Sequence, residues 1–338
     1  MKRMSTALAA LTAVTAVTTL ATALAGCGGS SAKPDDATVT VAHAPSTLFA
    51  PLYLAQAKGY FAERGLKVDL QTIKAGQDAI PLAASGKVDA VVAGFSAGMF
   101  NALHAGLDIK IVGTMGVSTG DPKASPTALE VSKKLVDAGT VKAPADLRGR
   151  SVALSGGPGA AGGYQLGVTL AGSGLTLRDV RAVNLSFPDM EAAIANGSVD
   201  AALPPAPFTT RMERNGVAVP LAVPPAGTAA SGVVYGAAFA GTDRAQKFFD
   251  ALVRASADLQ GTAAKSEQNL KILADATGED LAVLQRVPFY TWRPDLAPDA
   301  DQLTRQQRVY LDAGLLDFSE PLAPDKFVAP AFSQKAPR

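Results

Sequence analysis

A glycine-rich loop, Gly156-Gly157-Pro158-Gly159-Ala160-Ala161-Gly162-Gly163, is the stretch of this sequence best suited to chemistry. It follows an apolar run, residues 151–155, that predicts a strand, and it precedes a helical pattern at residues 164–171. Free backbone N–H groups in such a loop, at a helix N-terminus, can hold an anionic or polar group. The glycine spacing also satisfies G-x-G-x-x-G, the pattern of dinucleotide-binding enzymes.

A dinucleotide site also needs an acidic residue at the end of the next strand, where it holds a ribose hydroxyl. The next predicted strand, residues 180–185, ends in Ser186-Phe187-Pro188 instead. Asp179 precedes that strand, and Asp189 opens the helix after it. Because the fingerprint is incomplete, a dinucleotide-binding enzyme is the least favoured alternative.

Few residues could support metal or covalent chemistry. The chain has two histidines, His43 and His104, far apart in sequence, and a single cysteine, Cys27. It contains no Cys/His cluster with the spacing of a metal site. The sequence therefore predicts no metal, no cofactor and no catalytic residue, and it favours binding.

Composition limits the partners. The 338 residues are 48% hydrophobic, enough for one large or two ordinary domains. The formal net charge of +1 gives no electrostatic reason to expect a nucleic acid as partner.

One short pattern occurs twice, as ASGKVDA at residues 84–90 and ANGSVDA at residues 195–201. Its aspartates, Asp89 and Asp200, are 111 residues apart. In both copies an Ala-rich helical pattern stops at a glycine suited to a helix C-cap, and a short apolar strand follows. Each copy is an α-to-β step that closes a βαβ unit. Two copies in matching places predict two similar lobes with the functional site between them.

The N-terminus is typical of an exported protein. Lys2 and Arg3 precede an uncharged run, residues 7–25, which leads into Leu24-Ala25-Gly26-Cys27. LAGC resembles a bacterial lipobox, whose cysteine is lipidated, and the alternative is a plain secretory signal with an incidental cysteine. We expect a lipoprotein signal peptide at residues 1–27, lipidation at Cys27 and a flexible tether at residues 28–37.

Two loops of the first half follow predicted strands. The strand at residues 38–42 runs into His43-Ala44-Pro45-Ser46-Thr47, which faces the N-terminus of a helix predicted at residues 51–64. The strand at residues 88–93 runs into Gly94-Phe95-Ser96. Ser96 either caps the following helix or meets a ligand, and His43 either donates to a ligand or satisfies its own loop.

The run APLYLAQAKGYFAERGLKVDL, residues 50–70, followed by ASGKVDAVVAG, resembles the start of a known family. This family comprises the solute-binding proteins of nitrate, sulfonate, taurine and thiamine-pyrimidine-precursor ABC importers. The resemblance extends over residues 38 to about 249 and is strongest before Gly94. It implies an α/β, two-lobed type II periplasmic-binding-protein fold, in which each lobe is a mainly parallel sheet flanked by helices.

The same resemblance implies the domain boundaries. The first lobe is expected at residues 38–115 and 232–338, and the second at residues 116–231. Two crossover segments, residues 116–126 and 224–231, join the lobes. Helical patterns at residues 244–260, 262–277 and 299–313 are expected to pack on the first lobe.

A ligand site between the lobes follows from this fold. The family has ligand-contacting loops at the glycine loop and after the strand at residues 199–203. The candidate ligand-binding residues are His43, Ser46, Thr47, Gly94, Phe95, Ser96, Ser155, Gly157, Gly159, Ala160, Phe208 and Tyr235. Tyr290 and Trp292 are further cleft candidates. Packing of the aromatic residues, and a glycine turn without a ligand, stay open as alternatives.

The function that the resemblance implies is capture of a small solute by closure of the lobes, and its delivery to an ABC permease and ATPase. The solute would be a sulfonate- or nitrate-like anion or a small heterocycle. A lipid-anchored sensor or accessory protein of the same fold is the alternative. The family also includes pyrimidine synthases with an iron site and a cysteine-rich motif, for which this chain lacks the cysteines. We expect an extracytoplasmic monomer, anchored to the membrane by lipid.

Overall fold

The computed structural model describes residues 37–73 and 76–337. The expected signal peptide, Cys27 and all of the tether except Ala37 lie outside the described residues. Of the helices within them, none has both the length and the hydrophobicity that a membrane span requires.

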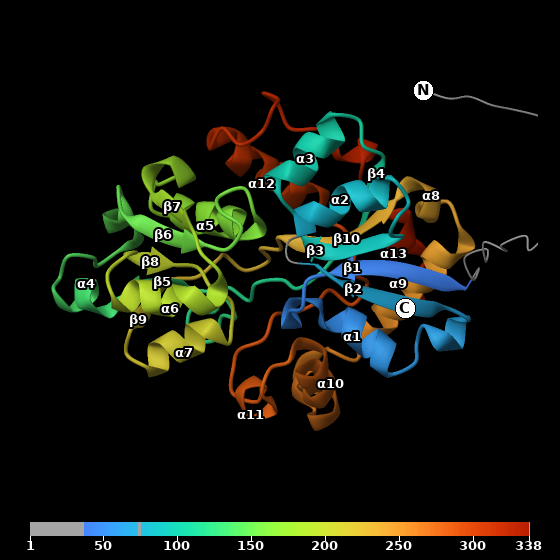
Figure 1. The fold of residues 1–338 in the computed structure, drawn as a ribbon, viewed down its shortest axis with the longest axis horizontal. Coiled ribbons are helices and arrows are strands. Elements are labelled where there is room, and N and C mark those ends of the chain that lie inside the picture. The colour runs from blue at the N-terminus through green and yellow to red at the C-terminus, as the bar shows by residue number, and fades with distance from the viewer. Residues whose placement is uncertain (1–36, 74–75, 338) are drawn as a thin grey trace, which may run out of the picture. The chain divides into compact units, whose positions relative to one another are not determined.

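Two five-stranded sheets form the framework (Figure 1). The first sheet has the order β2-β1-β3-β10-β4, with β1 (Thr38–His43), β2 (Lys67–Thr72), β3 (Ala90–Gly94), β4 (Ile109–Thr114) and β10 (Ser231–Gly236). The second has the order β7-β6-β8-β5-β9, with β5 (Leu129–Ser132), β6 (Ser151–Leu154), β7 (Arg181–Asn184), β8 (Ala201–Ala202) and β9 (Ala218–Ala222). Below, each sheet and the helices that cover it are called the first and the second lobe.

Each sheet contains one reversed strand. In the first sheet β10 is antiparallel to both of its neighbours, and in the second β5 is antiparallel to both of its own. Both are the first strands formed after the chain passes from one sheet to the other. The other four strands of each sheet run in one direction, which confirms the predicted α/β class with mainly parallel sheets. The sequence patterns did not predict β5.

The first sheet is buried on both faces, because alternate residues of its strands enter two different cores. Val41 and Val92 pack with α1 (Ala50–Ala57), α9 (Asp243–Ala257) and α10 (Glu267–Thr277), whereas Ala42 and Val91 pack with α2 (Gly76–Ala84) and α3 (Ala97–His104). Smaller elements complete this lobe: η1 (Thr47–Phe49), η2 (Ala62–Arg64), α8 (Ala237–Ala240), η5 (Gly261–Lys265), α11 (Leu281–Leu284), η6 (Pro324–Lys326) and α13 (Ala331–Lys335). The helix predicted over residues 51–64 is interrupted, because α1 ends at Ala57 and Gly59 takes a φ of +75°.

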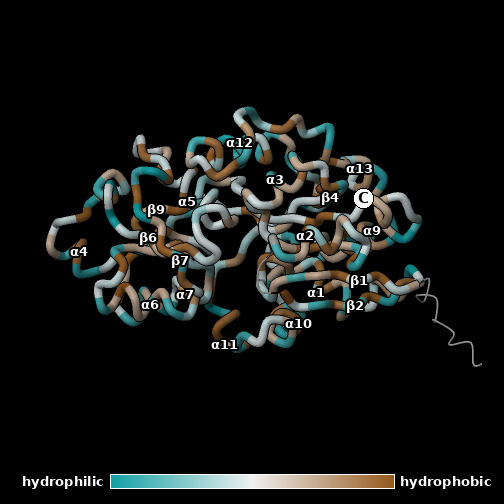
Figure 2. The backbone as a smooth tube through the Cα atoms, turned by 45° about the horizontal axis from the view of Figure 1, so that its top comes forward, coloured by the Kyte–Doolittle hydropathy of each residue, from teal (hydrophilic) through white to brown (hydrophobic). Residues whose placement is uncertain are grey.

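The second sheet is covered in the same way. On one face Val152 and Leu154 pack against α5 (Ala161–Ala171), and on the other Ala153 and Ala202 pack against α6 (Phe187–Ala195) and α7 (Phe208–Arg214). Three short elements lie in its connections: α4 (Lys133–Asp137), η3 (Pro144–Leu147) and η4 (Leu177–Asp179). Figure 2 shows the hydrophobic stretches, in brown, along strands of both sheets such as β1 and β6.

The repeated pattern has the same structural role in both sheets. Asp89 Oδ2 accepts the Thr40 N–H at 2.8 Å, and Asp200 Oδ2 accepts the Ser151 N–H, also at 2.8 Å. The two partners are 49 residues apart in each case. Each carboxylate therefore ties the strand that follows it to the neighbouring parallel strand. The repeated aspartates stabilise the sheets and lie at the strand ends opposite the loops predicted to bind ligand.

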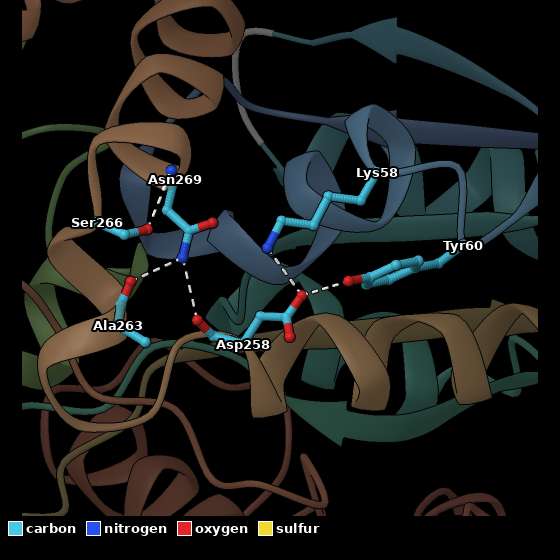
Figure 3. Close-up of polar contacts among 6 residues, drawn as sticks. All are labelled: Lys58, Tyr60, Asp258, Ala263, Ser266 and Asn269. Atoms are coloured by element: carbon cyan, nitrogen blue, oxygen red, sulfur yellow. Dashed lines mark hydrogen bonds and ion pairs between the residues drawn. The ribbon is translucent and has the colours of Figure 1, made fainter.

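A polar network joins three helices of the first lobe (Figure 3). Lys58 Nζ donates to Asp258 Oδ2 at 2.8 Å, and the Tyr60 hydroxyl donates to the same oxygen. The Asn269 amide donates to the carbonyls of Asp258 at 3.0 Å and Ala263 at 2.8 Å. Partial burial opposes ionisation of Asp258, but the hydrogen bonds from Lys58 and Tyr60 outweigh it and lower the pKa of this carboxyl. The network fixes the ends of α1 and α9 against α10.

One C-terminal helix packs on both lobes. The helix α12 (Ala300–Asp312) contacts α3 of the first lobe and also α5 and η4 of the second. Leu303 and Tyr310 of α12 share a hydrophobic cluster with Phe100 of α3 and Tyr164 of α5. The helix α12 therefore packs on the first lobe, as expected, and it contacts the second lobe as well, because its apolar side chains face both lobes.

Replacement of Asp200 by alanine tests the role of the repeated aspartate. Ser151 is 2% exposed, so its N–H would be left buried without an acceptor, and we expect a loss of about 2 kcal/mol in the free energy of unfolding at neutral pH. Partial burial opposes ionisation of Asp200, but the hydrogen bonds from Ser151 and the charge of Arg150 lower its pKa below the ordinary 3.8. The stabilisation is therefore complete above pH 3.8 and is lost as the pH falls through the lower, folded pKa.

Urea unfolding of wild type and Asp200→Ala at neutral and acidic pH measures this difference. Asp137→Ala is the control, because Asp137 forms only an exposed ion pair with Lys133 and should cost less than about 0.5 kcal/mol. Equal losses in the two variants would contradict the role given to Asp200.

Glu130 on β5 generates a second prediction. Its side chain is fully buried, and burial together with the neighbouring charge of Glu213 raises its pKa from 4.5 to about 8. Because the folded pKa is the higher one, folding takes up a proton between these values. Stability should fall by up to about 1.4 kcal/mol per pH unit as the pH rises through this window. Glu130→Gln should remove that loss, as measured by urea unfolding across the window. If the difference in the free energy of unfolding between wild type and Glu130→Gln stays constant with pH, Glu130 is ionised in the folded protein.

Candidate functional site

A cavity of about 250 Å³ lies where loops of both lobes meet. It opens beyond the carboxyl ends of the parallel strands, the usual ligand position in open α/β sheets. The lining residues come from both lobes, from the crossover segments and from the C-terminal part: Ala44, Pro45, Ser46, Leu48, Phe49, Gly76, Gly94, Ser96, Thr127, Ser155, Gly156, Ala160, Ala161, Gly162, Gln165, Phe187, Leu203, Pro205, Ala230, Ser231 and Tyr290.

The two predicted loops meet directly at this cavity. The Ala97 N–H, at the start of α3, donates to the Gly159 carbonyl at 2.8 Å. A Cβ atom placed on Gly94 would lie 2.8 Å from the Ala161 Cβ, closer than such atoms normally approach. The lobes are therefore in contact beside the cavity, and glycine at position 94 permits this close approach.

Two serines that line the cavity also cap helical turns. Ser46 Oγ accepts the Leu48 N–H at 3.2 Å, and Ser96 Oγ accepts the Met99 N–H at 3.2 Å. An oxygen that accepts from its own helix still carries an O–H that can donate. Ser96 therefore caps α3 and also lines the cavity, and its contact with a ligand stays a prediction.

Other hydroxyl groups add to the wall. Ser231 is fully buried, and its Oγ has no hydrogen-bond partner among the residues that the structure describes. Thr127 Oγ1 and the Tyr290 hydroxyl are 2.5 Å apart. Burial, only partly offset by the bond with Thr127, raises the pKa of Tyr290 to about 12, so this phenol keeps its proton at neutral pH.

The N-terminus of α5 supplies backbone donors. Ala161 and Gly162 are its first two residues, and their N–H groups have no acceptor within the helix. Both residues line the cavity, and Gly163, the third, donates to the Ala160 carbonyl at 2.9 Å. Together with the serine hydroxyls, these amides give a mainly apolar cavity a set of neutral donors, which suits a ligand with hydrogen-bond acceptors.

Five of the predicted ligand-binding residues line the cavity: Ser46, Gly94, Ser96, Ser155 and Ala160. Three others lie next to it without lining it. Thr47 begins η1, Gly157 belongs to the glycine loop, and Gly159 uses its carbonyl to accept from Ala97. Contact of Thr47, Gly157 and Gly159 with a solute stays a prediction.

The remaining four predicted side chains point elsewhere. His43 is 5% exposed, with Nδ1 3.1 Å from the Tyr53 hydroxyl, and burial lowers its pKa despite the bond with the Ala44 backbone. Phe95 is 3% exposed and packs in the core of the first lobe. Phe208 does not line the cavity, and its ring is 5.7 Å from that of Phe187, which does. Tyr235 is fully buried in the core and donates to the Ala245 carbonyl at 3.0 Å, so we remove it from the candidate site.

Several lining residues escaped the sequence analysis, including Thr127, Gln165, Phe187 and Ser231. Ser231 opens β10, which joins the sheet by antiparallel pairing with β3, and no local pattern indicates that pairing. Gln165 had an available signal, because it lies one helical turn after Ala161 and thus on the same face of α5. Of the two other aromatic candidates, Tyr290 lines the cavity, whereas the indole of Trp292 donates to the Leu48 carbonyl at 3.0 Å.

Comparison with known proteins relates this arrangement to a family. The sequence profile of the family described as NMT1/THI5 like matches residues 46–259, more than half of the chain. A curated protein of Aspergillus parasiticus, named 4-amino-5-hydroxymethyl-2-methylpyrimidine phosphate synthase, is 33% identical over 154 residues. That alignment covers 46% of this chain and 41% of the synthase, so the similarity spans less than half of either protein.

Solved structures share the fold. The alkanesulfonate-binding protein SsuA from Xanthomonas axonopodis pv. citri, bound to MOPS, has a TM-score of 0.67 and 23% identity, over 87% of this chain and 99% of that one. The periplasmic aliphatic sulphonate binding protein SsuA from Escherichia coli has a TM-score of 0.68 and 20% identity, over 88% and 99%. These similarities confirm the expected periplasmic-binding-protein fold.

The close approach at Gly94 generates a prediction about lobe contact. Gly94→Ala should force the two loops apart, because the new methyl group would meet Ala161 at 2.8 Å. Loss of the Ala97–Gly159 hydrogen bond should speed hydrogen exchange of the Ala97 amide about tenfold, as measured by NMR. Gly159→Ala is the control, because its Cβ would meet the Ala97 Cβ at an ordinary 3.5 Å. Similar exchange in both variants would mean that the lobes do not meet as described.

Proposed function

The chain belongs to the NMT1/THI5-like family, and on this premise we propose that it is the extracytoplasmic solute-binding lipoprotein of an ABC importer. It captures a small solute between its lobes and presents it to a permease and ATPase in the membrane. Binding shifts a hinge equilibrium toward the closed form, because the solute contacts both lobes only in that form.

The observation that carries this proposal is a mainly apolar cavity with neutral donors from both lobes, which are in contact beside it. Ser96 of the first lobe and Ala161 and Gly162 of the second line one space, and the Ala97–Gly159 hydrogen bond joins the lobes beside it. A solute held by these groups would bridge the lobes. This geometry supports a receptor that closes around its ligand.

The lining also indicates the chemical class of the solute. Its polar part consists of neutral donors from serine hydroxyls and helix N-termini, which suit an oxyanion or the carbonyl and ring nitrogen acceptors of a heterocycle. Its apolar part includes Leu48, Phe187 and Leu203. We therefore propose a compact solute with an acceptor-rich head group and a small apolar body, such as a sulfonate or a pyrimidine.

Two observations select the solutes for testing. The fold is shared with two sulfonate-binding proteins, which supports sulfonates. The relative named as a pyrimidine phosphate synthase supports pyrimidines. A sensor or accessory protein of the same fold would bind in the same cavity, and its partner would be a signalling protein in place of a permease.

A thermal-shift screen of the purified protein tests the proposal. The compounds are alkanesulfonates, nitrate, bicarbonate, pyrimidines and aromatic acids, with sodium chloride at the same concentration as the control. A solute at a hundred times its Kd should stabilise the native state by about 2.7 kcal/mol and raise Tm by a few degrees. Hits are then checked for chemical change by mass spectrometry. A hit recovered unaltered supports a receptor, whereas conversion of the hit would identify an enzyme and contradict the proposal.

A further inference from the structure

The helix α12 forms hydrogen bonds to a cavity loop of each lobe. The Tyr310 hydroxyl donates to the Ala160 carbonyl of the second lobe at 2.9 Å. The Gln306 amide donates to the Phe95 carbonyl of the first lobe at 3.1 Å and to the Tyr310 hydroxyl at 3.0 Å. Both side chains are fully buried. One continuous set of hydrogen bonds therefore runs from one lobe to the other through this helix.

These contacts are made to the segment that presents the backbone donors. Ala160 is the N-cap residue of α5, and the next two residues, Ala161 and Gly162, line the cavity. The preceding residue, Gly159, accepts the Ala97 N–H. The carbonyls of Gly159 and Ala160, which are consecutive in the glycine loop, thus accept hydrogen bonds from groups outside the second lobe.

Close packing supports the same placement. Val309 of α12 lies against α5 at Gly167, where an added Cβ would come within 2.5 Å of a Val309 methyl group. The Tyr310 ring is 6.3 Å from the ring of Phe100 on α3. Figure 1 shows α12 beside α3 and α5, in agreement with its contacts to both. The position of the Tyr310 hydroxyl is therefore fixed from both sides.

We propose that Tyr310, oriented by Gln306, is a positioning residue of the cavity that sets the first turn of α5 against the first lobe. In this role α12 is a third connection between the lobes, besides the two crossovers, and it belongs to the closed arrangement. The consequence for solute affinity rests on the proposed function, but the positioning of α5 does not.

Tyr310→Phe tests this inference, with Tyr235→Phe as a matched control. Each variant removes one buried hydroxyl that donates to a backbone carbonyl, that of Ala160 or that of Ala245. Both should lower Tm, and Tyr310→Phe should lower it more, because the buried Gln306 amide also loses its bond to the Tyr310 hydroxyl. Only Tyr310→Phe should speed hydrogen exchange at the Ala97 amide and in the first turn of α5, by about tenfold, in protein without added solute.

Solute binding provides the second measurement. For any compound found in the screen, Tyr310→Phe should weaken binding up to about tenfold, mainly through faster dissociation, while Tyr235→Phe leaves the affinity unchanged. Gln306→Met should change exchange and affinity in the same direction, and it serves in place of Tyr310→Phe if that protein does not fold. Unchanged exchange at Ala97 in these variants, or equal effects of Tyr310→Phe and Tyr235→Phe, would overturn the inference. If wild type binds no compound, the proposed function fails, and the exchange measurement still decides the role of Tyr310.

Discussion

Backbone N–H groups at two helix N-termini are the constraint on which the cavity depends. The first turns of α3 and α5 meet across it, and neither helix can satisfy these groups internally. Ala97 donates to the Gly159 carbonyl, and Met99 donates to Ser96 Oγ. Ala161 and Gly162 are left facing the cavity. The first lobe thus supplies a donor, the Ala97 N–H, and the second lobe supplies its acceptor, the Gly159 carbonyl. Contact between the lobes and the donors left for a ligand are therefore parts of the same hydrogen-bond pattern.

The sheets place those helices. Asp89 and Asp200 fix the starts of parallel strands in the two lobes, so the strands end at matching levels and deliver the loops at Gly94 and Gly156 to the same space. The packing of α12 on both lobes then limits how the loops move relative to each other. The positions of the groups that line the cavity are therefore set by elements that do not line it.

Most strands and helices and the two similar lobes were predictable from local patterns, because these elements carry regular apolar spacing and the repeat marks the βαβ units. The periplasmic-binding-protein fold itself was what the resemblance of residues 50–70 and 84–94 to a known family implied. β5 was missed, since a strand of four residues with Glu130 inside it breaks the apolar run that identifies buried strands. The site was predictable at the level of loops but less so for side chains. Phe95 and Tyr235 sit in the right segments and still face the cores, and Ser231 reaches the cavity through a pairing between distant strands. Such orientations depend on long-range register, which a single sequence does not reveal.

The crossovers have a mechanical consequence. They lie side by side: the Ser118 N–H donates to the Thr228 carbonyl at 2.8 Å, and Ser118 Oγ donates to the Pro224 carbonyl at 2.9 Å. Two segments joined by hydrogen bonds in this way form a ribbon. Such a ribbon bends out of its plane more easily than it deforms within its plane. In the proposed opening of the lobes, this joint would bend about one preferred axis, and each closure would return the two loops to the same alignment.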